Sequence, residues 1–339
     1  VAVADAFPAA AQAIADQYGC DIRSIDAILA AKDIDAVVIC TPTDTHADLI
    51  EAFAKAGKAI FCEKPIDLNI DRVKACLKVV RDTKAILMVG FNRRFDPHFA
   101  AVKGEIEKGT LGTVEMVTIT SRDPGAPPLD YIARSGGIFR DMTIHDFDMA
   151  RFLLGEEVAE VSAQASVLVD PAIGKAGDFD SVQVMLRTAS GKMALISNSR
   201  RATYGYDQRI EVHGAKGMVA AENQRPVSIE LANEKGYTRP PLHDFFMTRY
   251  TEAYANEIAS FISAVEKREV QELTIQGNRI EGTAYPELWK VVLSRSARSA
   301  RLARHDVGLA AGAAVRDGAQ PARRAAELLL ERLDVRVGR

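Results

Sequence analysis

Three short apolar runs in the first ninety residues each fit a strand that is buried on both faces of a sheet: 36–40, 59–62 and 86–90. A segment with helical spacing, 46–56, separates the first two runs, has Leu49, Ile50 and Phe53 on one face, and ends at Gly57. A second helix, starting at Asn69 or Asp71, precedes the third run. This order of strands and helices predicts an α/β domain with a parallel, doubly wound sheet.

The beginning of the chain also reads as a strand that ends in an acid, Val1 to Asp5, and it is followed by a helix over 8–18 that ends at Gly19. In dinucleotide-binding domains an acid at the end of the second strand binds the adenosine ribose hydroxyls, so Asp5 is a candidate for that role. A first strand with a Gly-x-Gly-x-x-Gly turn would precede it by about 20 residues. No such turn stands before Val1. Either the chain is a fragment that lacks its first strand, or Asp5 has no such role.

After Gly90 the pattern changes to strand-like segments separated by turn-forming residues: 114–120, 158–169, 181–186, 193–197, 208–213 and 227–231. One helix, from about Asp141 to Leu154, interrupts them, and another follows from about Tyr250 to Val265. We therefore expect a second, α+β domain with a mainly antiparallel sheet. The predicted divisions are an incomplete nucleotide-binding domain at 1–90, a substrate and oligomerisation domain at 91–273, and an atypical tail at 274–339.

The tail is rich in arginine and alanine, and from Val291 onward it has no lysine. It lacks the interleaved aromatic residues of a nucleic-acid-binding segment, so we expect a poorly ordered tail or sequence outside the native reading frame. The formal net charge of −3 gives no reason to expect nucleic acid or an anionic membrane as a partner. No apolar run approaches the roughly 20 residues of a membrane span. The four cysteines form no CxxC pair, which is typical of free thiols in a reducing cytoplasm.

Polar residues follow each of the three apolar runs, where a parallel sheet binds its ligands. They are the segments Thr41-Pro42-Thr43-Asp44-Thr45-His46, Glu63-Lys64-Pro65 and Phe91-Asn92-Arg93-Arg94. Each segment alone has a structural alternative: Asp44 or Thr45 could cap a helix, and the two arginines could be surface cations. Three such segments in succession favour a ligand site at one edge of the sheet.

Asp141 and His145 follow a pair of glycines and are four residues apart, so a helix would place both on one face. A carboxylate beside an imidazole raises its basicity and fixes its orientation, which suits a general base. A surface or capping pair is the alternative interpretation. No cluster of His, Cys and Asp residues has the spacing of metal ligands, so we expect no metal.

Taken together, Thr41-Pro42 before a helix, Glu63-Lys64-Pro65, and Asp141-x-x-x-His145 resemble the family of glucose-fructose oxidoreductase and inositol dehydrogenase. Within that family, the inositol dehydrogenases of bacteria resemble this chain most in three segments: 88–96, Ser121-Arg122-Asp123-Pro124 and Tyr204-Gly205-Tyr206-Asp207. The resemblance runs from Val1 to about Leu273. It implies a Rossmann-type domain that binds NAD and an enzyme that oxidises a ring hydroxyl of myo-inositol to the 2-keto product.

The resemblance also implies roles for individual residues. His145 would accept the hydroxyl proton, Asp141 would orient His145, and Lys64 would bind the reacting oxygen. The cofactor would contact the residues Asp5, Thr41, Pro42, His46, Glu63 and Lys64. The substrate hydroxyls would contact Arg122, Asp123 and Tyr206, together with Lys64, Asp141 and His145.

The family further implies a homo-oligomer, a dimer or tetramer that associates through the open face of the second sheet. Without the glycine-rich turn, this chain is expected to bind NAD weakly. Two other functions stay open: the same chemistry on another polyol or an aldose, and a non-catalytic sugar or nucleotide sensor. The presence of Lys64, Asp141 and His145 together favours an enzyme.

Overall fold

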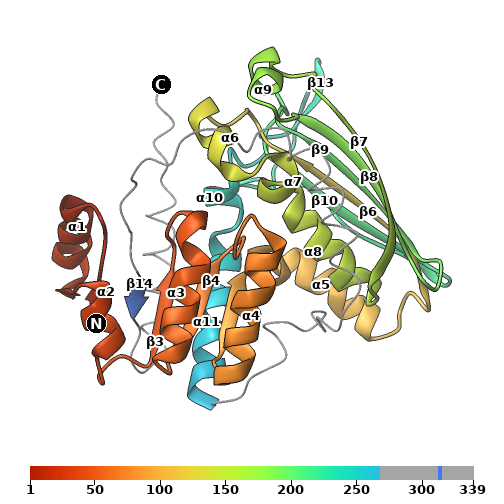
Figure 1. The fold of residues 1–339 in the computed structure, drawn as a ribbon. Coiled ribbons are helices and arrows are strands. Elements are labelled where there is room, and N and C mark those ends of the chain that lie inside the picture. The colour runs from red at the N-terminus through yellow and green to blue at the C-terminus, as the bar shows by residue number, and fades with distance from the viewer. Residues whose placement is uncertain (268–311, 315–339) are drawn as a thin grey trace. The chain divides into compact units, whose positions relative to one another are not determined.

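The computed structural model describes residues 1–267 and 312–314 of the chain, which form two compact units (Figure 1). Unit 1 comprises residues 1–92, 252–267 and 312–314, and unit 2 comprises residues 93–251. A 3-10 turn over Asn92–Phe95 stands where the chain leaves unit 1.

Unit 1 alternates strands and helices along the chain. Its elements are β1 (Ala2–Val3), α1 (Pro8–Tyr18), β2 (Asp21–Ile22), α2 (Ile25–Ala30), β3 (Ala36–Ile39), α3 (Thr43–Lys55), β4 (Ala59–Glu63), α4 (Ile70–Thr83), β5 (Leu87–Gly90), α11 (Thr251–Lys267) and β14 (Gly312–Ala314). The strand order is β2-β1-β14-β3-β4-β5. Neighbouring strands run parallel except for β14, which is antiparallel to both β1 and β3. In the related order 3-2-1-4-5-6, the first strand of a dinucleotide-binding sheet takes this central position.

The helices of unit 1 form where the sequence predicts them. Helix α1 ends at Gly19 in the left-handed conformation (φ 64°), and the side chain of Asn69 accepts hydrogen bonds from the first backbone amides of α4. Helices α3 and α4 lie side by side against the sheet in Figure 1. The ring of Phe261 in α11 meets the ring of Phe61 in β4 at 5.9 Å, so α11 also packs on the sheet.

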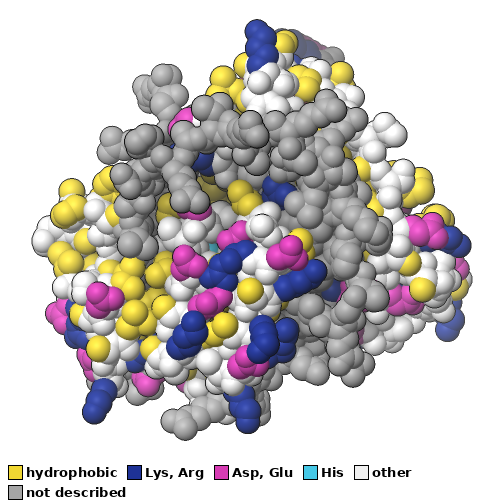
Figure 2. All heavy atoms as spheres, viewed as in Figure 1, with side chains coloured by type: hydrophobic (Ala, Val, Ile, Leu, Met, Phe, Trp, Pro, Cys, Tyr) yellow, Lys and Arg dark blue, Asp and Glu magenta, His cyan; other side chains and the backbone are white. Residues whose placement is uncertain are grey.

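One structural alternative for this unit is wrong. Neither Asp44 nor Thr45 caps α3 with its side chain, because the helix begins at Thr43, after Pro42, and both residues lie inside its first turn. The Thr45 hydroxyl instead bonds the Pro42 carbonyl at 2.8 Å. The outer surface of α3 and α4 carries Lys and Arg side chains interspersed with Asp and Glu (Figure 2), as in the ion pair between Arg72 and Asp48 at 2.5 Å.

Unit 2 consists of a large sheet with helices against one face. Its elements are α5 (Pro97–Glu107), β6 (Val114–Arg122), α6 (Leu129–Ser135), α7 (Ile138–Asp141), α8 (Thr143–Leu154), β7 (Val158–Ser166), α9 (Pro171–Lys175), β8 (Ser181–Thr188), β9 (Met193–Ser199), β10 (Asp207–Gly214), β11 (Gly217–Ala221), β12 (Leu231–Asn233), β13 (Gly236–Thr238) and α10 (Phe246–Arg249). The large sheet has the order β11-β10-β6-β9-β8-β7 and is antiparallel except between β6 and β9.

The strands of this sheet alternate buried and exposed residues, so one face forms the core. Helix α8 packs on β6 and β9 on that face. The other face exposes apolar side chains that are adjacent across the strands. Met193, Met116 and Met218 lie in one row with His213, and Met185 is paired with Leu195.

Several expectations for unit 2 need correction. The helix expected to begin at Asp141 is broken at Met142: Asp141 ends α7, and α8 begins at Thr143. The expectation of a single helix before Tyr250 is wrong, since α5, α6, α7, α9 and α10 also form. The start of α5 could have been predicted from the sequence, because Asp96 caps the helix and Pro97 is its first residue. The strand expected at 227–231 begins only at Leu231, and β11 was not predicted. The expected tail at 274–339 lies outside the described residues apart from 312–314.

Candidate functional site

The candidate cofactor residues of unit 1 follow neighbouring strands at one edge of the sheet. Strands β3, β4 and β5 are parallel and paired in sequence, with Ile39 opposite Cys62 and Glu63 opposite Gly90. Their carboxyl ends therefore lie together. Glu63 ends β4, and Thr41, Pro42 and Lys64 stand just beyond the strands. This is the crevice in which open α/β sheets bind ligands.

His46 joins two of these loops. Its side chain is buried, its Nδ1 lies 2.8 Å from the Pro65 carbonyl oxygen, and its Nε2 lies 2.7 Å from the Thr41 carbonyl oxygen. Burial lowers the pKa of His46, although both carbonyl contacts act in the opposite direction. The ring thus connects the loop after β3 to the Lys64–Pro65 segment, whose peptide bond is cis.

Glu63 ends β4 at the crevice and is partly buried. Burial raises its pKa to about 7, against the smaller opposing effects of the Lys64 charge and backbone amide. Its Oε2 accepts the Lys64 backbone N–H at 3.2 Å, and its Oε1 is buried with no hydrogen-bond partner among residues 1–267. A Cβ at position 90 would lie 3.0 Å from Oε2, so the glycine at position 90 leaves room for this carboxylate.

These features fit a bound dinucleotide. A buried acceptor such as Glu63 Oε1 is costly until a donor reaches it, and a ribose hydroxyl is such a donor. Asp5 stands two residues beyond β1, is partly exposed, and accepts the Phe7 backbone N–H at 2.9 Å with its Oδ1. An acid there can bind ribose hydroxyls and repel an additional phosphate.

Asp141 is held at both carboxylate oxygens. Its Oδ1 accepts the hydroxyl of Tyr131 at 2.7 Å, and its Oδ2 lies 3.3 Å from both terminal nitrogens of Arg200. His145 lies in the first turn of α8, where its backbone N–H donates to the Met142 carbonyl at 3.2 Å. Asp141 and His145 thus stand on two successive helices that meet at Met142.

The residues on either side of His145 are bonded to the sheet. Asp146 is fully buried and accepts hydrogen bonds from Arg93 (2.5 Å), Ser121 (2.6 Å) and Asn198 (2.7 Å). Thr143 donates to the Oδ1 of the same Asn198 at 2.7 Å. One amide on β9 therefore bonds residues on both sides of His145 and fixes the first turn of α8 against the sheet.

Arg122 and Asp123 lie at the end of β6. The Asp123 backbone N–H donates to the Ser199 carbonyl at 2.9 Å, which keeps the two chain segments together beyond the sheet. Burial raises the pKa of Asp123 to about 7; the charge of Arg200 opposes this and that of Asp141 adds to it. Asp123 and Asp141 therefore belong to the same electrostatic cluster.

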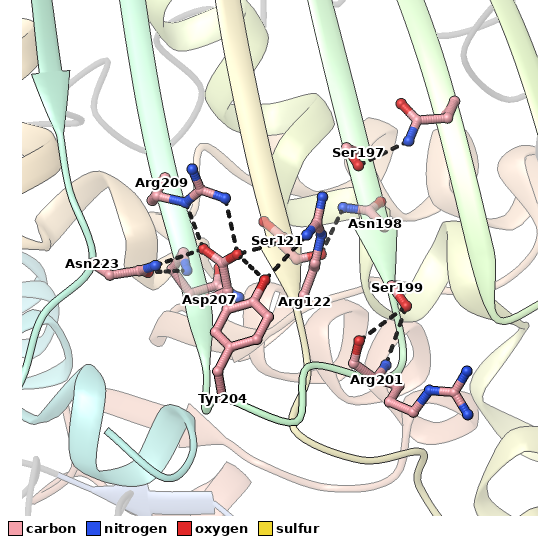
Figure 3. Close-up of polar contacts among 12 residues, drawn as sticks. Ser121, Arg122, Ser197, Asn198, Ser199, Arg201, Tyr204, Asp207, Arg209 and Asn223 are labelled. Carbon is pink, nitrogen blue, oxygen red and sulfur yellow. Dashed lines mark hydrogen bonds and ion pairs between the residues drawn. The ribbon is translucent and has the colours of Figure 1, made fainter. Parts of the chain in front are cut away.

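Arg122 points into a second polar group at the same end of the sheet (Figure 3). Its guanidinium donates to the Tyr204 hydroxyl at 3.1 Å, and that hydroxyl donates to Asp207 at 2.5 Å. Arg209 and Asn223 also donate to Asp207. Burial acts to raise the pKa of Asp207, but the hydrogen bonds from Arg209, Tyr204 and Asn223 outweigh it and lower the pKa.

The two tyrosines of the Tyr204-Gly205-Tyr206 segment lie in different surroundings. Tyr204 is half-exposed, whereas Tyr206 is buried between the rings of Phe245 (5.5 Å) and Tyr250 (6.0 Å). Burial raises the pKa of Tyr206 well above its ordinary value, so its hydroxyl stays protonated.

Arg93 and Arg94 are not surface cations. Arg93 is buried against Asp146, and Arg94 donates two hydrogen bonds to the two oxygens of Asp148, at 2.7 and 2.6 Å. Both acids lie on α8, so these arginines hold that helix. Spacing alone could not reveal this, because each pair is separated by more than fifty residues.

Sequence reasoning missed three residues around the candidate site: Tyr131, Asn198 and Arg200. Tyr131 had no readable partner. Asn198 and Arg200 stand at the end of a predicted strand, as Asp123 does, and that position was the available signal.

Two family models match the chain: the "Oxidoreductase family, NAD-binding Rossmann fold" over residues 1–91 and the "GFO/IDH/MocA C-terminal domain" over residues 99–220. The chain is 80% identical over 267 residues to an inositol 2-dehydrogenase of Rhizobium meliloti. The matched segment covers 79% of this chain and 81% of the relative. This chain belongs to the GFO/IDH/MocA oxidoreductase family. Its first domain is therefore of the NAD-binding kind.

Solved structures agree with this assignment. The structure described as a putative myo-inositol dehydrogenase of Sinorhizobium meliloti matches with a TM-score of 0.82 and 74% identity, over 88% of this chain and 90% of that one. A scyllo-inositol dehydrogenase of Lactobacillus casei, solved with NAD(H) and scyllo-inositol, matches with a TM-score of 0.75 and 28% identity, over 87% of each chain. The predicted fold class, a parallel α/β domain followed by a mainly antiparallel α+β domain, is confirmed.

Two features are absent from the part of the chain that the structure describes. None of its helices is long and apolar enough to cross a membrane. None of its His, Cys, Asp and Glu side chains gather in a group of three or more that could hold a metal ion.

Proposed function

We propose that this protein is an inositol 2-dehydrogenase that oxidises a ring hydroxyl of myo-inositol to the 2-keto product with NAD. The strongest support is the 80% identity to the Rhizobium meliloti enzyme of that name. The arrangement in unit 2 supports it independently, since a carboxylate held at both oxygens lies four residues from a histidine whose helix is fixed to the sheet.

NAD, when bound, supplies the hydride acceptor. In this proposal Asp5, Thr41, Pro42, His46, Glu63 and Lys64 bind it, with Glu63 Oε1 accepting a ribose hydroxyl. Only that oxygen among them is a buried acceptor without a hydrogen-bond partner in the described part of the chain.

The chain's own residues handle the proton. His145 accepts the proton of the reacting hydroxyl, and the negative charge of Asp141 stabilises the imidazolium that forms. The ammonium of Lys64 would donate a hydrogen bond to the same oxygen and favour its developing negative charge. Arg122, Asp123 and Tyr206 would bind the remaining hydroxyls, because a polyol in a buried site needs a partner for each.

Replacing His145 by alanine tests this proposal. We expect turnover of myo-inositol at saturating NAD to fall by about 10²–10⁴-fold, since that is the usual contribution of a general base. Absorbance of NADH measures it, with scyllo-inositol and glucose as competing substrates. His98→Ala, which changes an exposed histidine on α5, is the matched control and should retain full turnover.

Three results would contradict the proposal in different ways. Undiminished turnover of His145→Ala would refute the mechanism. A preference for glucose would mean that the same chemistry acts on an aldose and not on inositol. Binding of inositol without any NADH formation would indicate a sensor.

We also propose that the protein is a homo-oligomer that pairs through the open face of the unit 2 sheet. Met116, Met185, Met193, Leu195 and Met218 on that face are each at least 40% exposed, and a second copy would cover them. Sedimentation should give a dimer or tetramer, and Leu195→Lys should dissociate it, because a charge in such an interface has no partner. A wild-type monomer would refute this.

The free cysteines are consistent with the cytoplasm as the compartment of this protein.

A further inference from the structure

Arg200 is among the largest fully buried side chains of the described residues, with 1% of its surface exposed. It follows β9, between Ser199 and Arg201 at the end of the strand shown in Figure 3. Its backbone N–H donates to the Asp180 carbonyl at 2.8 Å, which fixes the chain there. A guanidinium at this depth is stable only with acidic partners.

The guanidinium of Arg200 lies close to two carboxyl groups and acts electrostatically on a third. Both of its terminal nitrogens lie 3.3 Å from Asp141 Oδ2, and one lies 3.8 Å from Asp178 Oδ2. The third is Asp123. Burial raises the pKa of Asp123 overall, and the charge of Arg200 is the largest effect that opposes this rise. One cation therefore offsets a group of three acids.

Arg200 and its partners also fix both ends of α7. Asp178 accepts the backbone N–H of Ile138, the first residue of α7, at 3.0 and 3.1 Å, and Asp141 is the last residue. Gly137 has φ 83°, and a Cβ there would lie 2.6 Å from Asp178 Oδ1, so glycine allows this close approach. Arg200 bridges the acids that stand at the two ends of this short helix.

We propose that Arg200 is a positioning residue for the dehydrogenase reaction: it keeps Asp141 ionised and oriented beside two other acids, so that His145 can accept the substrate proton. This rests on the proposed function. Without the cation, three clustered carboxyl groups would take up a proton at a higher pH, and Asp141 would lose the charge that stabilises the imidazolium.

Other charged and titratable groups surround this cluster. Tyr131 of α6 donates to Asp141, His145 lies on α8, and Arg93 and Asp146 both act on Asp123. These groups are unchanged in the variants below, so a difference between variants reports on Arg200 and Asp178.

The variant Arg200→Met tests the proposal through the pH dependence of kcat/KM for myo-inositol at saturating NAD. We expect the acidic limb to move to higher pH by about one unit or more, because loss of a nearby positive charge makes the coupled pair of Asp141 and His145 take up a proton at higher pH. Arg200→Lys retains the charge and should return the limb to within a few tenths of a unit. A limb that stays in place while turnover falls at every pH would mean a purely structural role and would refute the proposal.

The variant Asp178→Asn tests it in the opposite direction and does not depend on the folding of Arg200→Met. The amide oxygen can still accept the Ile138 N–H, but a negative charge is gone, so Arg200 acts on Asp141 with less competition. The acidic limb should move to lower pH, and an unmoved limb would refute the proposal. Arg151→Met is the matched control: it removes a buried arginine that pairs with Glu157 at 2.9 Å, and the limb should stay in place.

A measurement without cofactor or substrate separates this inference from the proposed function. Carbon-13 labelling of the aspartate carboxyl groups, with Asp141→Asn to assign the signal, follows protonation of Asp141 in the free protein. Its midpoint should rise in Arg200→Met and fall in Asp178→Asn. If these shifts occur but inositol is not oxidised, the proposed function fails. If wild-type enzyme is active, His145→Ala is inactive and neither midpoint moves, the inference fails alone.

Discussion

Asp146 in unit 2 is a buried acid and Glu63 in unit 1 is a partly buried acid with one enclosed oxygen, and their surroundings differ. Asp146 accepts hydrogen bonds from Arg93, Ser121 and Asn198. Glu63 has one backbone donor at 3.2 Å and a second oxygen with no hydrogen-bond partner among residues 1–267. The comparison indicates that the negative charge of Asp146 stabilises the fold. The negative charge of Glu63 instead lowers the stability of the fold, and a ligand that donates a hydrogen bond to it can offset that loss.

The largest effect should come from Asp146→Asn. It leaves the buried Arg93 guanidinium without its ionic partner, and loss of one partner of a buried pair typically costs about 3 kcal/mol or more. Denaturant unfolding of unit 2 measures it. The exposed pair of Arg187 and Glu160 provides the control, because Glu160→Gln should change the free energy of unfolding by no more than about 0.5 kcal/mol. Equal losses of unfolding free energy in Asp146→Asn and Glu160→Gln would show that the buried acid contributes no more to stability than the surface acid.

A smaller effect of opposite sign is expected for Glu63→Gln. The pKa of Glu63 is raised by burial from 4.5 to about 7, so the folded protein binds its proton more tightly than the unfolded chain does. This contribution to stability is fully present below about pH 4.5 and is lost as the pH rises to about 7. Glutamine removes that dependence, and above pH 7 the variant should be more stable than the wild type by up to about 3 kcal/mol.

Unfolding measured between pH 5 and 8 tests this expectation. The slope of stability against pH should become more positive in Glu63→Gln than in the wild type. Destabilisation above pH 7 would show that the Glu63 carboxylate is fully compensated within the fold, and the comparison with Asp146 would no longer hold. Affinity for NAD, measured in parallel, should fall because an amide is a weaker acceptor for a ribose hydroxyl than a carboxylate.

Local pattern was enough to predict most of unit 1. Buried parallel strands appear as continuous apolar runs, and Gly19 and Asn69 mark helix ends that can be read directly. The chain order of such strands also brings Thr41, Glu63 and Lys64 to one edge of the sheet. Motifs shared with the family added proposed roles for Asp141 and His145, which spacing alone left open.

The tertiary structure decided what surrounds those residues. The partners of Asp141 are Tyr131, ten residues before it, and Arg200, fifty-nine residues after it, and Arg93 meets Asp146 across fifty-three residues. Hydrophobic periodicity reports which face of an element is buried, but it carries no information about which distant charge will compensate a buried one. The sequence by itself determined the family, the two kinds of sheet and the candidate catalytic residues. The break at Met142 and the cation beside Asp141 followed only from how the strands and helices of unit 2 pack, because a buried charge selects its partner in space.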